Sequence, residues 1–324
     1  LDASRSAIYM PMTKSFPDNS EMEAIVTFTG QATGRYLSSV IPDRQTVSVH
    51  LHHSFIRLPD DGYEPVPLDP RSGFFGRTFK DYATPVGESL RVSYAARHRL
   101  EKVNPMAETS DAVEPIIYYV DRGAPEPIRT ALIEGAEWWN QAFEAAGYRN
   151  AFQVELLPAS ADPMDVRYNI IQWVHRATRG WSYGSSIADP RTGEIMKGKV
   201  THGSLRVRQD YLIAEGLLAP YDDEEKPDVM LDMALARIRQ LSAHEVGHTL
   251  GIQHNMAAST QGRASVMDYP HPLIRIDDDG NIDLSDAYDD GIGEWDERVV
   301  LWGYQDFLEG VDRQAARDQI MAGT

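Results

Sequence analysis

An eleven-residue segment, HEVGHTLGIQH, places a set of metal ligands and a general base next to one another. Histidines four positions apart on a helix point in nearly the same direction, so His244 and His248 would share one helix face. Glu245 follows the first histidine and lies near enough to hold a water bound to the same metal. A continuing helix would carry His254 to the far side, but Gly251 can adopt the left-handed conformation, end the helix and let the chain return. The segment therefore predicts one Zn²⁺ bound by three neutral imidazoles, with one open coordination position.

A chance match to this segment is improbable. A bare HExxH arises by chance in roughly one chain of this length per hundred, and the added glycine and third histidine lower that to about one in 10⁵. The competing interpretation is a buried helix whose histidines only satisfy hydrogen bonds in the core. The rarity of the full pattern argues against it, and we interpret the segment as a zinc site.

A second motif follows the first, because Met267 lies thirteen residues after His254 in the segment SVMDY. Taken alone, a methionine in an apolar run is more often a core residue that fills an irregular gap. Together, the two motifs resemble the metzincin metallopeptidases, in which a methionine lies in a tight turn, the Met-turn, beneath the three-histidine site. The resemblance implies that Met267 occupies this turn. It also implies that Tyr269, as in some metzincin branches, ligates the resting metal or donates a hydrogen bond to the oxyanion, the alternative being a tyrosine that only packs.

Other segments resemble a group of large, exported bacterial zinc metalloproteases that have a β-rich region ahead of a metzincin-type catalytic domain. The segments are YATP at 82–85, ARHRLEK at 96–102, WWNQAF at 138–143, DPRTGE at 189–194 and HNM at 254–256. The resemblance implies an α+β fold with a β-rich region over residues 1–110 and a metzincin-like zinc peptidase domain over 111–324. That domain would contain a twisted, mostly parallel sheet with an antiparallel edge strand, two long helices and the Met-turn. It further implies an exported protein, whether periplasmic, outer-membrane-associated or secreted.

The pattern of apolar residues and turn formers agrees with this organisation. Stretches rich in β-branched and aromatic residues favour strands in the first hundred residues, and alternating strand and helix patterns follow from residue 114. The predicted strands are 23–29, 46–56, 116–120, 152–157, 168–174, the hairpin 184–188 with 194–200, and a hairpin joining 274–276 to 282–284; the predicted helices are about 126–146, 228–250 and 294–302. Residues 183–188 resemble the edge strand of the metzincin cleft, which can pair with an extended peptide. The alternative is a surface hairpin without a role.

Composition limits the partners. The chain has 324 residues, which predicts one large or two medium domains, and its formal net charge of −18 argues against nucleic acid or anionic membrane as a partner. The absence of cysteine excludes disulfides, thiol catalysis and latency through a propeptide thiolate. The sequence contains no run of 18 apolar residues, so it predicts no membrane-spanning helix. The chain begins at Leu1 without a methionine or a signal-like segment, which favours a fragment or a processed form.

Three other features are weaker candidates for sites. Residues 277–286 resemble a calcium loop, but aligning Gly280 with the required glycine puts Arg275 at the first ligand position, so a turn explains them better. His50, His52 and His53 lie in a predicted strand, where no nearby carboxylate in the sequence supports a second metal. The acidic run 222–225 is most simply a solvated loop, and His175 and His202 are assigned no role.

These observations predict a zinc-dependent endopeptidase in which Glu245 is the general base and a peptide or protein is the substrate. Two alternatives stay open: a zinc hydrolase of a non-peptide amide, and a zinc-containing binding module with little catalysis. An intact Glu245 argues against the second, because a purely structural metal does not need a base. A further hypothesis is that an N-terminal segment crosses the cleft and keeps the enzyme latent.

Overall fold

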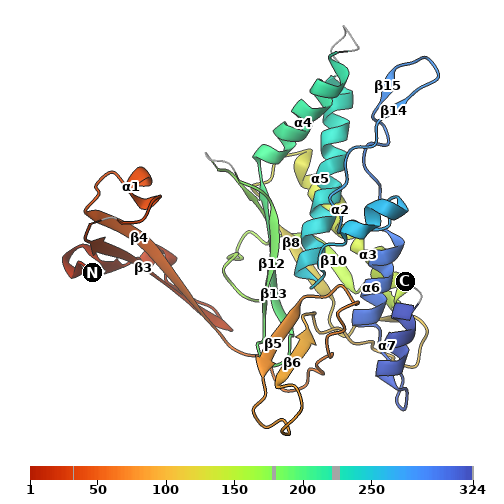
Figure 1. Cartoon of the computed structure of the whole chain (residues 1–324), viewed down its shortest axis with the longest axis horizontal. Helices are drawn as coiled ribbons and strands as arrows, with labels where there is room; N and C mark the ends of the chain where they lie inside the picture. The colour runs from red at the N-terminus through yellow and green to blue at the C-terminus, as the bar shows by residue number, and fades with distance from the viewer. Residues whose placement is uncertain (32, 177–179, 221–226, 323–324) are drawn as a thin grey trace. The chain divides into compact units, whose positions relative to one another are not determined.

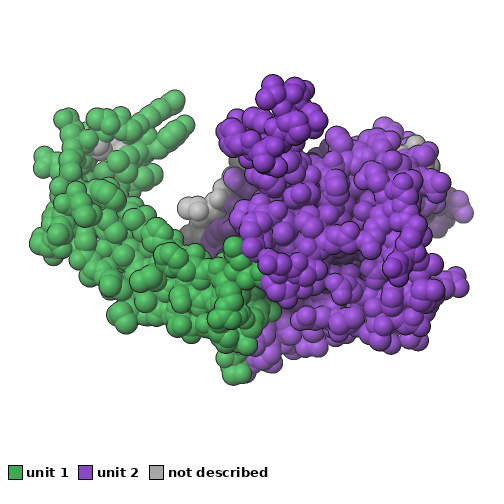
Figure 2. Space-filling view, turned by 90° about the horizontal axis from the view of Figure 1, so that it is seen from below, with its two compact units in different colours: residues 1–59, 160–167 green, residues 60–159, 168–324 purple. Residues whose placement is uncertain are grey.

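The computed structural model describes residues 1–31, 33–176, 180–220 and 227–322, so the predicted acidic loop at 222–225 lies outside the described residues. Contacts divide the chain into two compact units (Figure 2): unit 1 comprises Leu1–Pro59 and Ser160–Arg167, and unit 2 comprises Asp60–Ala159 and Tyr168–Thr324. These units are defined by contacts between residues and not by a domain boundary in the sequence. The domain boundary predicted near residue 110 remains a prediction.

Unit 1 is built on a four-stranded antiparallel sheet. Its two long strands, β3 (Asn19–Thr29) and β4 (Thr46–Ile56), pair along their whole length, from Asn19 opposite Ile56 to Thr29 opposite Thr46. The short strands β1 (Ala7–Ile8) and β2 (Lys14–Ser15) add to β3, and the short helices are η1 (Ala3–Arg5), η2 (Met10–Met12) and α1 (Leu37–Val40). The prediction of a β-rich N-terminal region is therefore confirmed.

The segment 160–167 completes unit 1, although it lies between two strands of unit 2 in the sequence. The Lys14 ammonium lies 2.5 Å from the Asp162 carboxylate. Buried Asn19 donates to the carbonyl of Met164 at 3.0 Å and accepts from the Val166 N–H at 3.0 Å. A buried amide whose donor and acceptor are both used fixes the partner segment closely.

Unit 2 contains a five-stranded sheet in the order β10-β8-β11-β13-β12 (Figure 1). Strands β10 (Phe152–Leu156), β8 (Ile116–Val120), β11 (Asn169–Val174) and β13 (Ile195–Gly203) are parallel, while β12 (Tyr183–Ala188) is antiparallel to β13 at the edge. Strands β8 and β11, in the middle of the sheet, are mostly apolar, as expected for strands covered on both faces. The mixed sheet and its antiparallel edge strand confirm the predicted α+β fold.

The helices of unit 2 agree with the sequence in part. The long helix α5 (Pro227–Thr249) and the closing helix α6 (Glu294–Tyr304) were predicted, but the helix predicted over 126–146 is two helices, α2 (Ile128–Glu137) and α3 (Trp139–Ala145). Two further helices, α4 (Leu205–Leu218) and α7 (Arg313–Ala322), were not predicted. Helix α4 leaves Leu212 and Ile213 exposed and shows no clear apolar stripe, whereas α7 is short and mostly polar and buries only Arg317 and Met321.

Smaller elements complete unit 2: the hairpin of β5 (Gly76–Lys80) and β6 (Arg91–Ala95), the pair of β7 (Ser110–Asp111) and β9 (Tyr148–Arg149), the helix η3 (Met256–Gln261), and the predicted hairpin of β14 (Arg275–Ile276) and β15 (Ile282–Asp283). Throughout the part of the chain that the structure describes, helices fall short of the length and hydropathy that a membrane crossing requires.

Helix α5 is held in place by an unusually close approach of α2. A Cβ built on Gly135 would lie 2.0 Å from the carbonyl oxygen of Arg239, so only glycine lets the two helix backbones come this near. The Ser242 hydroxyl donates to the Leu132 carbonyl at 2.7 Å, and the Trp139 indole N–H donates to the Ala243 carbonyl at 2.8 Å. These contacts fix α5 one turn before its first metal-motif histidine.

Candidate metal centre

Helix α5 ends directly after its two motif histidines. Gly251 has φ +99°, and a Cβ at this position would lie 1.8 Å from the Ala96 carbonyl oxygen. The N–H groups of Gly251 and Ile252 donate to the carbonyls of His248 and Gly247, at 3.1 and 3.0 Å, which closes the last turn. The chain therefore turns back at the glycine, as the sequence predicts.

The two helix histidines are oriented by backbone carbonyls. His244 Nδ1 lies 2.8 Å from the Val266 carbonyl oxygen, and His248 Nδ1 lies 2.8 Å from that of Ile252. Because a carbonyl oxygen can only accept, each Nδ1 carries the proton and each Nε2 keeps its lone pair. This arrangement is typical of histidines that bind a metal through Nε2.

His254 joins the other two after the turn. Its Nε2 lies 3.0 Å from that of His248, and the potential ligand atoms of the three histidines all lie within 4.8 Å of one another. Tetrahedral zinc with bonds of about 2.0–2.1 Å would hold such nitrogens roughly 3.3 Å apart. Burial lowers the pKa of His244 to about 3 and also lowers the pKa values of His248 and His254, so all three are neutral near pH 7. The donor set therefore fits a zinc ion.

The segment 265–269 forms a turn directly beneath this cluster. Met267 is fully buried, and a Cβ on Gly247 would lie 2.3 Å from its sulfur, so the methionine lies against the helix between the two histidines. Its own N–H donates to the Ser265 hydroxyl at 2.9 Å. The preceding Val266 provides the carbonyl that orients His244. The turn thus supports the cluster through both a side chain and the backbone.

Two family models match separate parts of the chain. Residues 226–322, which contain the histidine cluster and this turn, match the model of a family described as Met-zincin. The chain contains a Met-zincin domain. Residues 1–103 match the model of a domain of unknown function (DUF5117). A search of curated proteins gave no match.

Glu245 of the Met-zincin domain is almost completely buried, with 5% of its surface exposed. Burial raises the pKa of this carboxyl to about 7, while the Gly184 N–H of β12, which donates to it, and the charge of Arg237 act in the opposite direction. A Cβ on Gly184 would lie 2.1 Å from the Glu245 carbonyl oxygen. The edge strand therefore contacts the helix closely at this glutamate.

The Tyr269 hydroxyl lies next to the histidine cluster of the Met-zincin domain. The hydroxyl lies 2.8 Å from His254 Nε2, and the ring lies over that of His244 with centroids 5.3 Å apart and planes 30° apart. The residue is 54% exposed, so its hydroxyl is open to solvent and to a ligand. Metal ligation and hydrogen bonding to a substrate are both open to a hydroxyl in this position.

Asp296, which the sequence did not single out, ties the turn to α6. Its fully buried carboxylate accepts from the Ser265 hydroxyl at 2.7 Å and from the N–H groups of Val266 and Gly293, both at 2.8 Å. Burial raises its pKa to about 6. The available signal was its place three residues after Gly293, where acids commonly cap helix N-termini.

A segment far from the motif in sequence also borders the site. The Phe75 N–H donates to the Gly251 carbonyl and the Gln253 N–H donates to the Gly73 carbonyl, both at 2.7 Å. The Phe75 ring lies 5.8 Å from that of His248. These contacts hold the returning strand that carries the third histidine, and no local pattern in the sequence indicated them.

The histidines of β4 belong to a ladder of carboxylates and imidazoles in unit 1. Glu23 contacts Nδ1 of both His50 and His52, at 2.6 and 2.9 Å, and Glu21 contacts His52 Nε2 at 2.6 Å. The carboxylates that the sequence did not place nearby come from the paired strand β3. Among the described residues the triad of the Met-zincin domain is the group of three ligand side chains close enough to hold a metal ion, and the ladder is described by its hydrogen bonds.

The remaining candidates are accounted for structurally. The Asp277 carboxylate accepts from the N–H groups of Asp279 and Asn281, at 3.0 and 2.8 Å, so it closes the β14–β15 turn. His175 is exposed and contacts the Ser204 hydroxyl at 2.9 Å. His202 is fully buried on β13, with neither ring nitrogen hydrogen-bonded in the described structure.

Proposed function

We propose that the protein is a zinc-dependent endopeptidase. The observation that carries the proposal is the convergence of three neutral imidazoles, two of them oriented by backbone carbonyls, beside a buried glutamate. Three histidines with a fourth position left open are a ligand set of catalytic zinc sites. His244, His248 and His254 would hold the ion.

Bound zinc supplies a water of lowered pKa and polarises the carbonyl of the substrate. In this proposal Glu245 takes the proton from the attacking water and returns it to the leaving amine. Its pKa of about 7 suits both transfers, because a group whose pKa lies near the working pH can accept and donate a proton. The Gly184 N–H fixes the carboxylate, and Tyr269 donates a hydrogen bond to the oxyanion.

A peptide is the substrate class that the surroundings favour. Strand β12 is the edge of the sheet, and its residues alternate between exposed and half-buried along the strand. An extended peptide can add to such an edge through backbone hydrogen bonds. The same strand contributes Gly184 to the site, so a peptide paired with it would run beside Glu245. We also propose, from the family resemblance alone, that the protein is exported.

The test is digestion of a diverse peptide library by the zinc-loaded protein, read by mass spectrometry. Glu245→Ala is assayed alongside Glu215→Ala, which changes an exposed acid on α4. We expect cuts with the native protein and with Glu215→Ala, and almost none with Glu245→Ala at an unchanged zinc content. Full activity in Glu245→Ala would remove this residue from the mechanism.

Tyr269→Phe extends the same assay to the oxyanion. Removing one such donor lowers turnover by about 10²-fold or more in well-studied hydrolases, so we expect a loss of this size with zinc retained. Unchanged turnover would assign Tyr269 to packing alone. Hydrolysis of small amides without any cut in the peptides would favour the non-peptide hydrolase, and stoichiometric zinc without any turnover would favour the binding module.

A further inference from the structure

One pocket in unit 2 is lined by none of the metal ligands. It has a volume of about 210 Å³ and is lined by four arginines and several aromatic rings. The residues that matter most are Tyr63, Arg97, Arg99, Tyr304, Arg313 and Arg317. An inference about this pocket is independent of the proposed peptidase activity.

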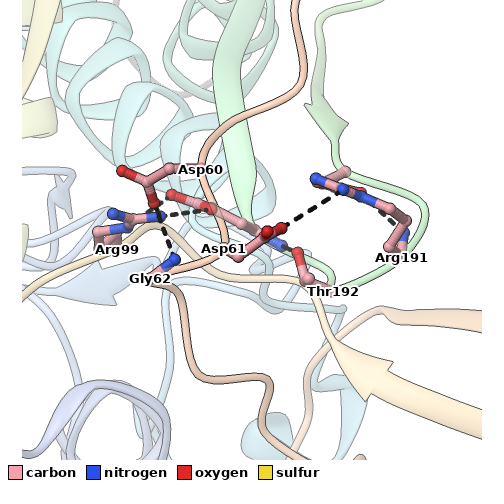
Figure 3. A network of polar contacts seen from close by, with 8 residues as sticks. Asp60, Asp61, Gly62, Arg99, Arg191 and Thr192 are labelled. Carbon is pink, nitrogen blue, oxygen red and sulfur yellow. Dashed lines mark hydrogen bonds and ion pairs between the residues drawn. The ribbon is translucent and has the colours of Figure 1, made fainter.

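Two of the four arginines have their charge matched by carboxylates. Arg99 pairs with Asp60 at 2.8 Å (Figure 3). It also pairs with Glu194 at 2.9 Å. Arg313 forms an ion pair with Glu64. These two side chains form part of the pocket wall and bring no unbalanced charge.

Arg97 and Arg317 differ, because within the described chain neither lies within ion-pair distance of a carboxylate. Arg97 donates to the Glu64 backbone carbonyl at 3.3 Å and lies 4.9 Å above the Tyr63 ring centre. Arg317 donates to the Trp302 carbonyl at 3.3 Å and lies 5.1 Å from the centre of the Phe307 ring. Their direct partners are therefore carbonyls and rings, and the Glu64 carboxylate, which acts on the charge of Arg317, forms its ion pair with Arg313.

The other two acids that line the pocket do not provide an ion-pair partner. Glu101 and Asp306 form no ion pair with Arg97 or Arg317. The Asp306 carboxylate instead accepts from the Lys102 backbone N–H at 2.7 Å. A small pocket in a chain of net charge −18 thus has two unmatched cations in its wall.

Two buried donors in the same wall also lack partners. The Tyr63 side chain is 5% exposed, and its hydroxyl has no hydrogen-bond partner. The same holds for Nε of Arg97. Buried polar atoms are rarely left unsatisfied in folded proteins, because each one retains the full cost of losing water. Both residues line the pocket, so an acceptor bound there would lie near these donors.

The arginines also repel one another. Burial and the charges of Arg97 and Arg313 lower the pKa of Arg317 to about 10, against the opposite effect of the Glu64 carboxylate. A guanidinium holds its proton very firmly, so a lowered value indicates that the positive charge is poorly compensated in this position. An anion would remove that penalty.

We propose that this pocket binds a small organic anion, whose carboxylate or phosphate oxygens contact Arg97, Arg317 and the Tyr63 hydroxyl. Guanidinium groups match both kinds of oxyanion, because their donors form a planar fork. A cavity of about 150 Å³ can hold benzene, so a pocket of about 210 Å³ has room for an anion with a small carbon body. The rings of Tyr63, Tyr304 and Phe307 would contact that body.

Isothermal titration of the whole zinc-loaded protein tests the proposal at low ionic strength. The probes are succinate, inorganic phosphate and neutral succinamide. We expect saturable binding of at least one of the two anions and none of succinamide. The tighter of the two anions identifies the preferred oxygen chemistry.

Variants locate the binding. Arg97→Gln and Arg317→Gln should weaken it at least tenfold, because each removes a charge-assisted hydrogen bond. Arg71→Gln is the control, since this exposed arginine pairs with Asp69 and does not line the pocket. Tyr63→Phe removes only an unpartnered hydroxyl, so it should fold normally and still weaken binding several-fold.

A carboxylate could also ligate the zinc ion, and the same variants separate the two sites. Binding that keeps its affinity in both Arg97→Gln and Arg317→Gln lies elsewhere and would overturn the proposal. So would equal binding of succinamide and succinate, or no saturable heat from either anion.

Discussion

His244 and His248 each use one ring nitrogen to contact the backbone, at Val266 and Ile252. The metal-facing nitrogen of each ring is thereby fixed by segments outside the helix that carries it. Neither ring can rotate away without breaking a 2.8 Å hydrogen bond. Ordering of this kind before the metal arrives reduces the entropy that binding has to overcome.

At the residue scale we predict that His248→Ala loses the metal. Two imidazoles hold zinc far less firmly than three, so zinc content measured by elemental analysis after dialysis should fall from about one ion per chain to near zero. His175→Ala is the matched control, because this exposed histidine hydrogen-bonds Ser204 and is not one of the clustered ligands, so it should leave the content unchanged. Equal zinc in the two variants would show that the ligand assignment is incorrect.

The sequence predicts most of the site at this scale, because helix geometry alone places two histidines and a glutamate on adjoining positions of one face. The glycine after them specifies the turn that returns the third histidine. Asp296 and the segment 73–75 could not be found in this way. Asp296 contacts Ser265 across 31 residues, and only the folded chain brings the two together.

At the element scale the decisive contact is the crossing of α2 and α5. Gly135 lets the α2 backbone approach the Arg239 carbonyl, and the hydrogen bonds of Trp139 and Ser242 hold the next turn of α5. The position of the zinc ligands therefore depends on a residue without a side chain.

Gly135→Ala should destabilise unit 2 by about 1–3 kcal/mol, because the added methyl group forces the two helices apart. Gly216→Ala on α4 is the matched control, since its Cβ would meet nothing within 4 Å. That substitution should stabilise by about 0.5–1 kcal/mol through helix propensity alone. Urea denaturation of the two variants measures both values, and a Gly135→Ala protein as stable as Gly216→Ala would contradict the close crossing.

The sequence predicts elements well where the pattern is simple. Buried parallel strands such as β8 are short apolar runs, and their limits follow from the flanking turn residues. Helix α4 was missed because its apolar positions do not form one stripe, and α7 because it is a short segment in which Arg, Gln and Asp make up half of the ten residues. The break at Trp138 was missed because the apolar spacing continues through it from α2 into α3.

At the scale of the whole molecule, buried histidines link stability to pH. His98 lies in unit 2, where its Nε2 is 3.2 Å from both the Tyr118 hydroxyl and the Thr249 carbonyl, and burial lowers its pKa to about 4. An unfolded histidine titrates near pH 6.5. Between these values the unfolded chain binds the additional proton, so this contribution to stability is complete above pH 6.5 and is lost as the pH falls towards 4.

We predict that His98→Gln removes part of this dependence. The native protein should lose of the order of 3 kcal/mol through this one group between pH 7 and pH 4, and the variant should not. Asp296 and Glu245, whose pKa values are raised, act oppositely in both proteins and cancel in the comparison. All six tryptophans lie in unit 2, so tryptophan fluorescence during denaturation at several pH values reports this unit alone. Parallel pH curves for the two proteins would contradict the prediction.

Because the segment 160–167 belongs to unit 1 but lies between two segments of unit 2 in the sequence, a single cut in the chain cannot separate the two units. A protease that cut after Pro59 would leave the N-terminal piece attached, because Lys14 and Asn19 hold a loop that belongs covalently to the other piece. The nicked protein would migrate as one particle until a denaturant parted it. A protein produced without residues 1–59 would instead leave Asp162, Met164 and Val166 without these partners. Any excision meant to reveal a latent activity must therefore shorten that loop as well.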